Sequence, residues 1–171
     1  LAAAITLQQA GLSVLLIEAK DSIGGGLRSA GLTLPGFVHD VCSAIHPLAI
    51  ASPFFKKLHL KQHGLEFIHP TIAAAHPLDD GSAAAVYRSI EETAQSLGKD
   101  KPAYLNLIQL LVEDWPLIEG DVLSPLHFPK HPLAMLRFGI KALRSAAHLS
   151  KRFQTKEARA LWAGMAAHSI Q

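Results

Sequence analysis

The chain of 171 residues has the length of one ordinary domain or of a piece of a larger one. Its hydrophobic content is 49% but its aromatic content only 6%, a balance that favours packed helices over an all-β fold. The net charge of +2 excludes the strongly basic footprint of a nucleic-acid-binding domain. Cys42 is the only cysteine, which excludes an internal disulfide and a cysteine-rich zinc site, and we expect a reducing, cytoplasmic compartment.

The first eighteen residues carry the second half of a dinucleotide-binding fingerprint. Ala4, Leu7, Gly11, Val14 and Glu18 have the spacing that follows the third glycine of a G-x-G-x-x-G loop. The pattern predicts a helix that ends at Gly11, a parallel strand over residues 14–17, and a carboxylate at the strand tip that accepts hydrogen bonds from an adenosine ribose. Many α/β proteins share this succession, so a chance match stays open, and so does NAD as the nucleotide.

A cluster of three glycines lies six residues beyond Glu18. Gly24, Gly25 and Gly26 allow the backbone to come close to a bulky ligand, a feature that a plain nicotinamide-binding domain does not need. A merely flexible turn is the alternative interpretation.

This order of residues resembles the FAD-dependent oxidoreductases of the phytoene desaturase and amine oxidase type, among them the phytoene dehydrogenase-like proteins. Their second motif has an acid, a spacer, Gly-Gly-Arg and then a Thr or Ser, and here Glu18, residues 24–26 and Ser29 take these places. A further stretch of the family is matched by Pro35, Gly36, Phe37 and Asp40. Gly26 stands where the family usually has arginine, so a guanidinium contact to the flavin pyrophosphate must come from Arg28 or be absent.

The resemblance implies an α/β fold in which a partial FAD-binding, Rossmann-like βαβ unit occupies residues 1–70. Residues 71–171 would then form an α+β, mainly helical substrate or cap region. The first strand and glycine loop of the βαβ unit are not in the sequence, so the resemblance implies a chain truncated at both ends. We expect such a fragment to bind FAD poorly and to be inactive alone, because its first helix has no shaped anion site. The implied FAD contacts are Glu18, Gly24, Gly25, Gly26, Arg28 and Ser29.

Beyond the glycine cluster, residues 54–64 predict a short helix and residues 65–69 a strand. The Asp-Gly pair at residues 80–81 lies between two apolar segments and predicts a β-hairpin, because this pair accepts the positive φ of a tight turn. Ser89, with Glu92 three residues on, predicts a capping box at the start of a helix.

The remaining segments predict helices only. Gly98 closes the helix that Ser89 begins, and Pro102 opens a second helix whose apolar stripe ends at Pro116. Two more helices follow the proline-rich residues 125–132, the second from near Thr155.

The ten histidines do not form a metal-binding motif. His59 and His63 are four residues apart, but no glutamate lies between them and no third ligand is evident. His127 and His131 have the same spacing, which Pro129 takes out of helical register. We therefore expect no metal site, and the sequence names no catalytic residue. Three residues are interpreted as parts of the core: Cys42, Trp115 and Trp162.

A basic amphipathic helix is predicted over residues 133–152. Six cations and no acid occur here: Lys130, Arg137, Lys141, Arg144, Lys151 and Arg152. Apolar residues recur on the opposite face at helical spacing: Leu133, Leu136, Ile140, Leu143 and Ala147. An ordinary solvated helix explains the pattern, and so does peripheral contact with an anionic membrane or an acidic partner. No apolar run approaches the roughly 20 residues of a membrane span.

The resemblance implies an enzyme that uses FAD to take a hydride from a C–C or C–N bond. The apolar middle of the chain favours a hydrophobic small-molecule substrate. Two alternatives stay open: a flavin-fold binding module without turnover, which the glycine at position 26 favours, and an NAD-linked dehydrogenase, which Glu18 allows.

Overall fold

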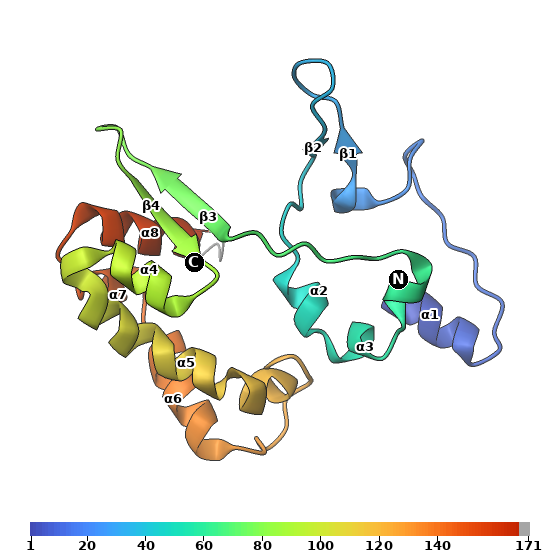
Figure 1. The fold of residues 1–171 in the computed structure, drawn as a ribbon. Helices are drawn as coiled ribbons and strands as arrows, with labels where there is room; N and C mark the ends of the chain where they lie inside the picture. Colours follow the sequence, from blue (N-terminus) through green and yellow to red (C-terminus); the bar gives the residue numbers. More distant parts are fainter. Residues whose placement is uncertain (168–171) are drawn as a thin grey trace. The chain divides into compact units, whose positions relative to one another are not determined.

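The structure is a computed structural model that describes residues 1–167. The chain divides into two compact units, Leu1–Gly64 and Leu65–Gln171 (Figure 1). This division falls a few residues before the boundary at residue 70 that the sequence predicts. The roles assigned to the two parts stay predictions.

The first unit begins with helix α1, Ala2–Gln9. Gly11, at φ +82°, ends it in a Schellman motif, in which the Leu12 N–H donates to the Leu7 carbonyl and the Gly11 N–H to the Gln8 carbonyl. The helix and its glycine end are as predicted.

The parallel strand predicted over residues 14–17 is wrong. These residues are extended but pair with no other strand within the described part of the chain. Leu15 and Ile17 are 84% and 81% exposed, whereas a parallel strand is normally buried on both faces. A β-strand forms only where a second strand donates and accepts its backbone hydrogen bonds. The described residues supply no parallel strand beside residues 14–17.

The rest of the first unit is a small ribbon followed by short helices. Strands β1 (Ser29–Ala30) and β2 (His39–Asp40) pair antiparallel after the 3₁₀ turn η1 (Gly25–Leu27). The helical elements that follow are α2 (Pro47–Ala51), α3 (Pro53–Lys56) and the 3₁₀ turn η2 (Leu60–His63). The predicted helix over residues 54–64 is thus broken after Lys56, and the predicted strand over residues 65–69 is not formed.

The second unit opens with the predicted hairpin, formed by β3 (Ile72–Pro77) and β4 (Ala83–Tyr87). Gly81 has φ +82°, and Asp80 Oδ1 accepts from the Ser82 N–H at 3.1 Å and from the Ser82 hydroxyl at 2.6 Å. The Asp-Gly pair therefore makes the turn by the mechanism predicted.

Helix α4 (Ile90–Ser96) starts at Ser89, whose hydroxyl oxygen accepts from the Glu92 N–H at 3.2 Å. The predicted capping box is only half formed, because the Glu92 carboxylate accepts no bond from the Ser89 N–H among the described residues. The Ser89 hydroxyl instead donates to the Glu91 carboxylate at 2.9 Å. The 3₁₀ turn η3 (Gly98–Asp100) then leads into α5, Lys101–Val122. Helix α5 continues through Pro116, so the predicted stop there is wrong.

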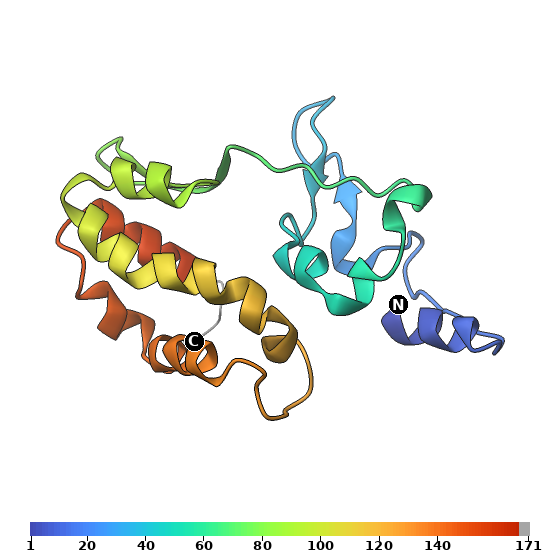
Figure 2. The ribbon, with the colours of Figure 1, turned by 60° about the horizontal axis from the view of Figure 1, so that its bottom comes forward.

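Three further helices complete the unit: α6 (Pro132–Ala142), α7 (Ala146–Ser150) and α8 (Lys156–Ala167) (Figure 2). The start of α8 is as predicted. The single basic helix over residues 133–152 is wrong, because the chain leaves the helix after Ala142 and Ser145 caps a new one.

The core of the second unit joins the hairpin to α5, α7 and α8. It consists of Ala84, Leu97, Leu107, Leu149, Phe153, Ala158 and Leu161. Asp100 is also fully buried and accepts from the Gln154 and Thr155 N–H groups, both at 2.8 Å, and from the Thr155 hydroxyl at 2.6 Å. This carboxylate therefore ties the start of α5 to the turn before α8.

Candidate functional site

The glycine cluster forms an exposed turn in the first unit. Gly24 and Gly25 have φ of +119° and +55°, conformations that side chains rarely adopt. The Leu27 N–H donates to the Gly24 carbonyl at 2.9 Å, which closes the turn. Gly26 is different: its φ is not positive, and an added Cβ would lie at an ordinary 3.8 Å from Cys42. Its local backbone therefore does not require glycine.

The β1–β2 ribbon brings two motif segments together. Ser29 donates its hydroxyl proton to Asp40 Oδ1 at 2.9 Å, and the backbone of Val41 and Ser43 donates to the carbonyls of Arg28 and Gly26. The glycine turn thus lies beside residues 40–43. Because the Ser29 proton is engaged by Asp40, this hydroxyl can offer a ligand only acceptor capacity unless that bond is exchanged.

Two predicted site residues are charged and accessible. Arg28 donates through Nε to the Gly25 carbonyl at 2.8 Å, and its terminal nitrogens make no hydrogen bond within the described residues. Glu18 is exposed, accepts from the Lys20 N–H at 3.0 Å, and makes no hydrogen bond to residues 24–29. The structure therefore brings Arg28 and Ser29 to the glycine turn but does not connect Glu18 to it.

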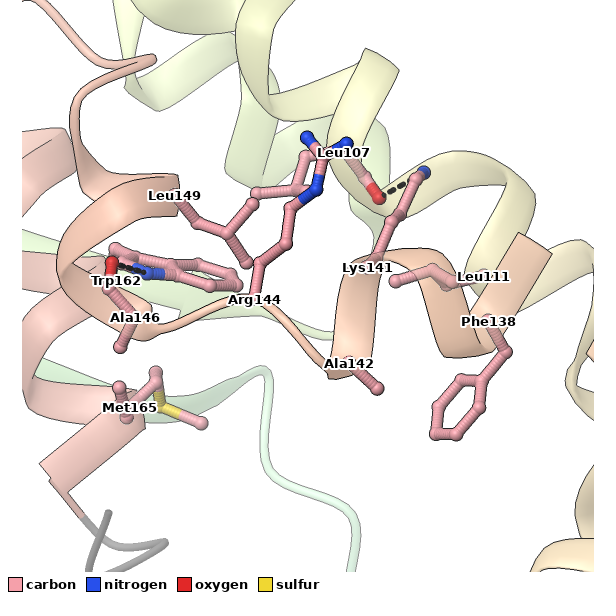
Figure 3. Close-up of a pocket in the computed structure, with 11 residues that line it drawn as sticks. Leu107, Leu111, Phe138, Lys141, Ala142, Arg144, Ala146, Leu149, Trp162 and Met165 are labelled. Atoms are coloured by element: carbon pink, nitrogen blue, oxygen red, sulfur yellow. Dashed lines mark hydrogen bonds between the residues drawn. The ribbon is translucent and has the colours of Figure 1, made fainter. Parts of the chain in front are cut away.

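An apolar pocket occupies the second unit between α5, α6, α7 and α8 (Figure 3). Its volume is about 260 Å³, and a neighbouring cavity of about 220 Å³ under β4 shares Trp162 and Met165 with it. The walls are mostly aliphatic and aromatic side chains: Leu107, Leu111, Phe138, Leu149, Trp162 and Met165. Each volume lies below the roughly 300–1,000 Å³ of sites for drug-sized molecules, so either cavity alone suits a smaller ligand.

The pocket residues were missed by sequence reasoning. The apolar stripe of α5 and the two tryptophans predict that these side chains are buried. They do not predict that a cavity lies beside them. Trp162 packs against the core, as predicted, and donates from Nε1 to the Ala146 carbonyl at 3.0 Å. The small side chains of Ala142 and Ala146 leave space that larger residues would fill.

Two cations line the same pocket. Lys141 donates from Nζ to the Asn106 and Leu107 carbonyls at 3.1 and 2.7 Å. Burial, together with the charge of nearby Arg152, lowers the pKa of Lys141. Arg144 lines the pocket from the link between α6 and α7.

Helix α6 is tied to α5 through one of its cations. Arg137 forms a bidentate ion pair with buried Asp114 of α5, at 2.7 and 2.6 Å. The hydrogen bonds from this guanidinium lower the pKa of Asp114 despite burial, and the carboxylate raises that of Arg137. The apolar row of α6 is exposed: Leu133, Leu136, Ile140 and Leu143.

The remaining candidates are isolated side chains. Cys42 is exposed, so its interpretation as a core residue is wrong. His127 bonds the Pro125 carbonyl and Asp121, which raises the pKa of this imidazole. Within residues 1–167, no group of three histidine, cysteine, aspartate or glutamate side chains is placed to hold a metal ion. No helix of that same part is long and apolar enough to cross a membrane.

Comparison with known proteins gives one family match, which lies within the first unit. Residues 1–58 match the sequence profile of the NAD(P)-binding Rossmann-like domain. The matched region includes the α1 half-motif, the glycine turn and the β1–β2 ribbon.

The chain is also similar to one of the subunits of limonene dehydrogenase from Castellaniella defragrans. The two are 23% identical over 124 residues, which covers 72% of this chain and 22% of that protein. These similarities support a dinucleotide-binding oxidoreductase. The chain spans about a fifth of the length of this relative. No solved structure matches the chain.

Proposed function

We propose that residues 1–171 form part of an FAD-dependent, phytoene dehydrogenase-like oxidoreductase that takes a hydride from a hydrophobic substrate. The observation that carries the proposal is the exposed glycine turn, held beside Asp40 by the Ser29 hydrogen bond within the region similar to dinucleotide-binding domains. When bound, the flavin accepts the hydride, and the protein supplies binding, orientation and exclusion of water.

The first unit fits a supporting role at the cofactor. The backbone at Gly25 has open space where a side chain would stand, whereas the Arg28 side chain lies against Gly24. The terminal nitrogens of Arg28 are available to donate to a phosphate. Ser29 would hold this turn to Asp40, and the Glu18 carboxylate would accept from ribose hydroxyls. Residues 1–64 have no fully buried side chain, so we propose that segments outside this chain complete the site and cover its apolar residues.

The second unit fits the substrate side of the reaction. Its pocket is walled by apolar side chains, which favours a lipophilic molecule over a polar one. The name of the relative refers to limonene, itself a hydrocarbon, which agrees with this substrate class.

We also propose peripheral contact with an anionic membrane, through part of the surface that the sequence predicts. The exposed apolar row of α6 supplies the insertion face, and exposed Lys130, Arg144 and Lys151 supply positive charge. Arg137 is excluded from this role because it is paired with Asp114.

Visible absorption spectra of the purified full-length protein test the cofactor assignment. Flavin bands that are bleached anaerobically by a lipophilic substrate are the expected result. Flavin bands with no reduction by any lipophilic candidate would favour the binding module, which the glycine at position 26 supports. A colourless protein that binds NAD instead would favour the nicotinamide-linked dehydrogenase.

A further inference from the structure

The apolar pocket of the second unit has positively charged side chains at one edge. Most of its wall is aliphatic or aromatic, yet Lys141 and Arg144 both line it. In Figure 3 the cationic ends of both side chains extend toward Leu107 of α5, while Trp162 and Met165 face the pocket from α8. The site therefore combines an apolar interior with a positively charged edge.

The charges at this edge have no carboxylate partner. Within the described residues, neither Lys141 nor Arg144 forms an ion pair, and Asp114, the nearby acid, is taken by Arg137. Lys141 is half-buried and held by two backbone carbonyls, which position its ammonium group without neutralising it. An uncompensated cation beside a low-dielectric cavity attracts an anion more strongly than one in open water.

A second feature extends the positive edge. Arg144 also lines an open depression together with Ser145 and His148, on the outer side of the α6–α7 link. An oxyanion at Arg144 would thus lie at the boundary between the pocket and solvent, where it keeps part of its hydration.

We propose that this pocket binds an aliphatic or isoprenoid chain that ends in an oxyanion, with the chain against Trp162 and Met165 and the carboxylate or phosphate against Lys141 and Arg144. The inference deepens the proposed function, since it gives the hydrophobic substrate an acidic head group. It requires only the second unit, which has its own core.

Three ligands with one chain and different head groups test the proposal: geranyl phosphate, geranate and uncharged geraniol. Isothermal titration calorimetry of the full-length protein measures the affinity for each of the three ligands. We expect at least one of the two anions to bind about tenfold tighter than geraniol, the gain of one charge-assisted hydrogen bond. The better anion distinguishes a phosphate from a carboxylate head. Equal affinity for all three ligands would overturn the proposal.

Matched variants locate the anion. Arg144→Gln should remove the preference for the anions and leave geraniol binding unchanged, whereas Lys151→Gln, which alters an exposed cation outside the pocket lining, should change neither. Ala142→Trp should fill the pocket and abolish binding of all three ligands. An anion preference that survives Arg144→Gln would contradict the assignment.

The outcome is separable from that of the proposed function. Selective binding of the anions by a protein without flavin would contradict the proposed flavin-dependent function and support the proposed pocket. A flavoprotein that binds geraniol, geranate and geranyl phosphate with equal affinity would support the proposed flavin-dependent function and contradict the proposed pocket.

Discussion

At the residue scale, Asp100 shows how one buried carboxylate organises a fold. Burial would raise its pKa, but hydrogen bonds from the Thr155 hydroxyl and from the backbone of Gln154 and Thr155, with the charge of Arg159, lower it overall. The ionised form is therefore the one that the folded second unit stabilises.

The sign of this pKa shift sets the pH dependence of stability. A carboxyl with a lowered folded pKa stabilises the protein above its unfolded pKa of about 3.9, and this stabilisation is lost as the pH falls through the lower, folded value. We expect Asp100→Asn to lower the free energy of unfolding at neutral pH by about 2–4 kcal/mol, because an amide cannot accept all three hydrogen bonds. Urea denaturation across acid and neutral pH measures this, with exposed Asp79→Asn as the control. A variant as stable as the parent at neutral pH would refute the role of Asp100.

Gly26 offers a second test at this scale. Its φ is compatible with a side chain, and an added Cβ meets Cys42 only at van der Waals distance. We expect Gly26→Arg to supply the guanidinium that the resemblance implies at this position and to tighten FAD binding roughly tenfold, as for one charge-assisted hydrogen bond. Fluorescence titration of the full-length apoprotein with FAD measures the change. Gly31→Arg, on the same ribbon, controls for added charge, and an equal effect of both variants would count against the proposed site.

At the scale of elements, helix α6 shows what a periodic pattern leaves open. The spacing of its cations and leucines defines two faces correctly, but not which one meets the rest of the protein. That choice depends on Asp114, 23 residues earlier in the chain, whose buried carboxylate draws Arg137 inward and leaves the leucines outside. Sequence periodicity carries no signal for such a distant partner.

The exposed row of α6 leads to a prediction about membranes. We expect the protein to sediment with anionic phospholipid vesicles at low salt, and Leu136→Gln with Leu143→Gln to reduce the bound fraction severalfold, because less apolar surface enters the lipid. Val112→Gln on α5 is the matched control, since Val112 is also apolar and exposed. Vesicle binding that is indifferent to the α6 variants, or absent in the parent, would contradict this proposal.

Helix α5 provides a stability prediction through Pro116. Inside a helix, a proline lacks the N–H that would bond the carbonyl four residues earlier, so Pro116→Ala should stabilise the second unit by about 1–3 kcal/mol. Pro132→Ala, at the start of α6 where that N–H is not needed, should change stability much less. Chemical denaturation measures both, and a destabilised Pro116→Ala variant would mean that the helix depends on the proline.

At the scale of the whole molecule, the sequence predicts local features and misses those that need distant partners. The hairpin at Asp80 and Gly81 and the cap at Ser89 form as expected, because a few adjacent residues decide them. The strands expected over residues 14–17 and 65–69 do not form, because strand pairing requires neighbours that the described chain does not supply. The pocket was not predictable either, since it arises where four helices meet.

The two units also differ in how their motifs relate to a core. The second unit has a packed core around Phe153 and Leu107, whereas no residue of the first is fully buried. The ribbon brings some of the predicted cofactor contacts together, while Glu18 makes no hydrogen bond to them within the described residues.

We propose that Glu18 and the glycine turn belong to one FAD site, and equilibrium binding of FAD to the full-length apoprotein tests this most directly. We predict that FAD binds, that NAD does not compete, and that Glu18→Gln weakens FAD binding roughly 10- to 100-fold, the range for hydrogen bonds to a charged group. Exposed Glu66→Gln should have no effect. No FAD binding by the parent, or an affinity that Glu18→Gln leaves unchanged, would contradict the account.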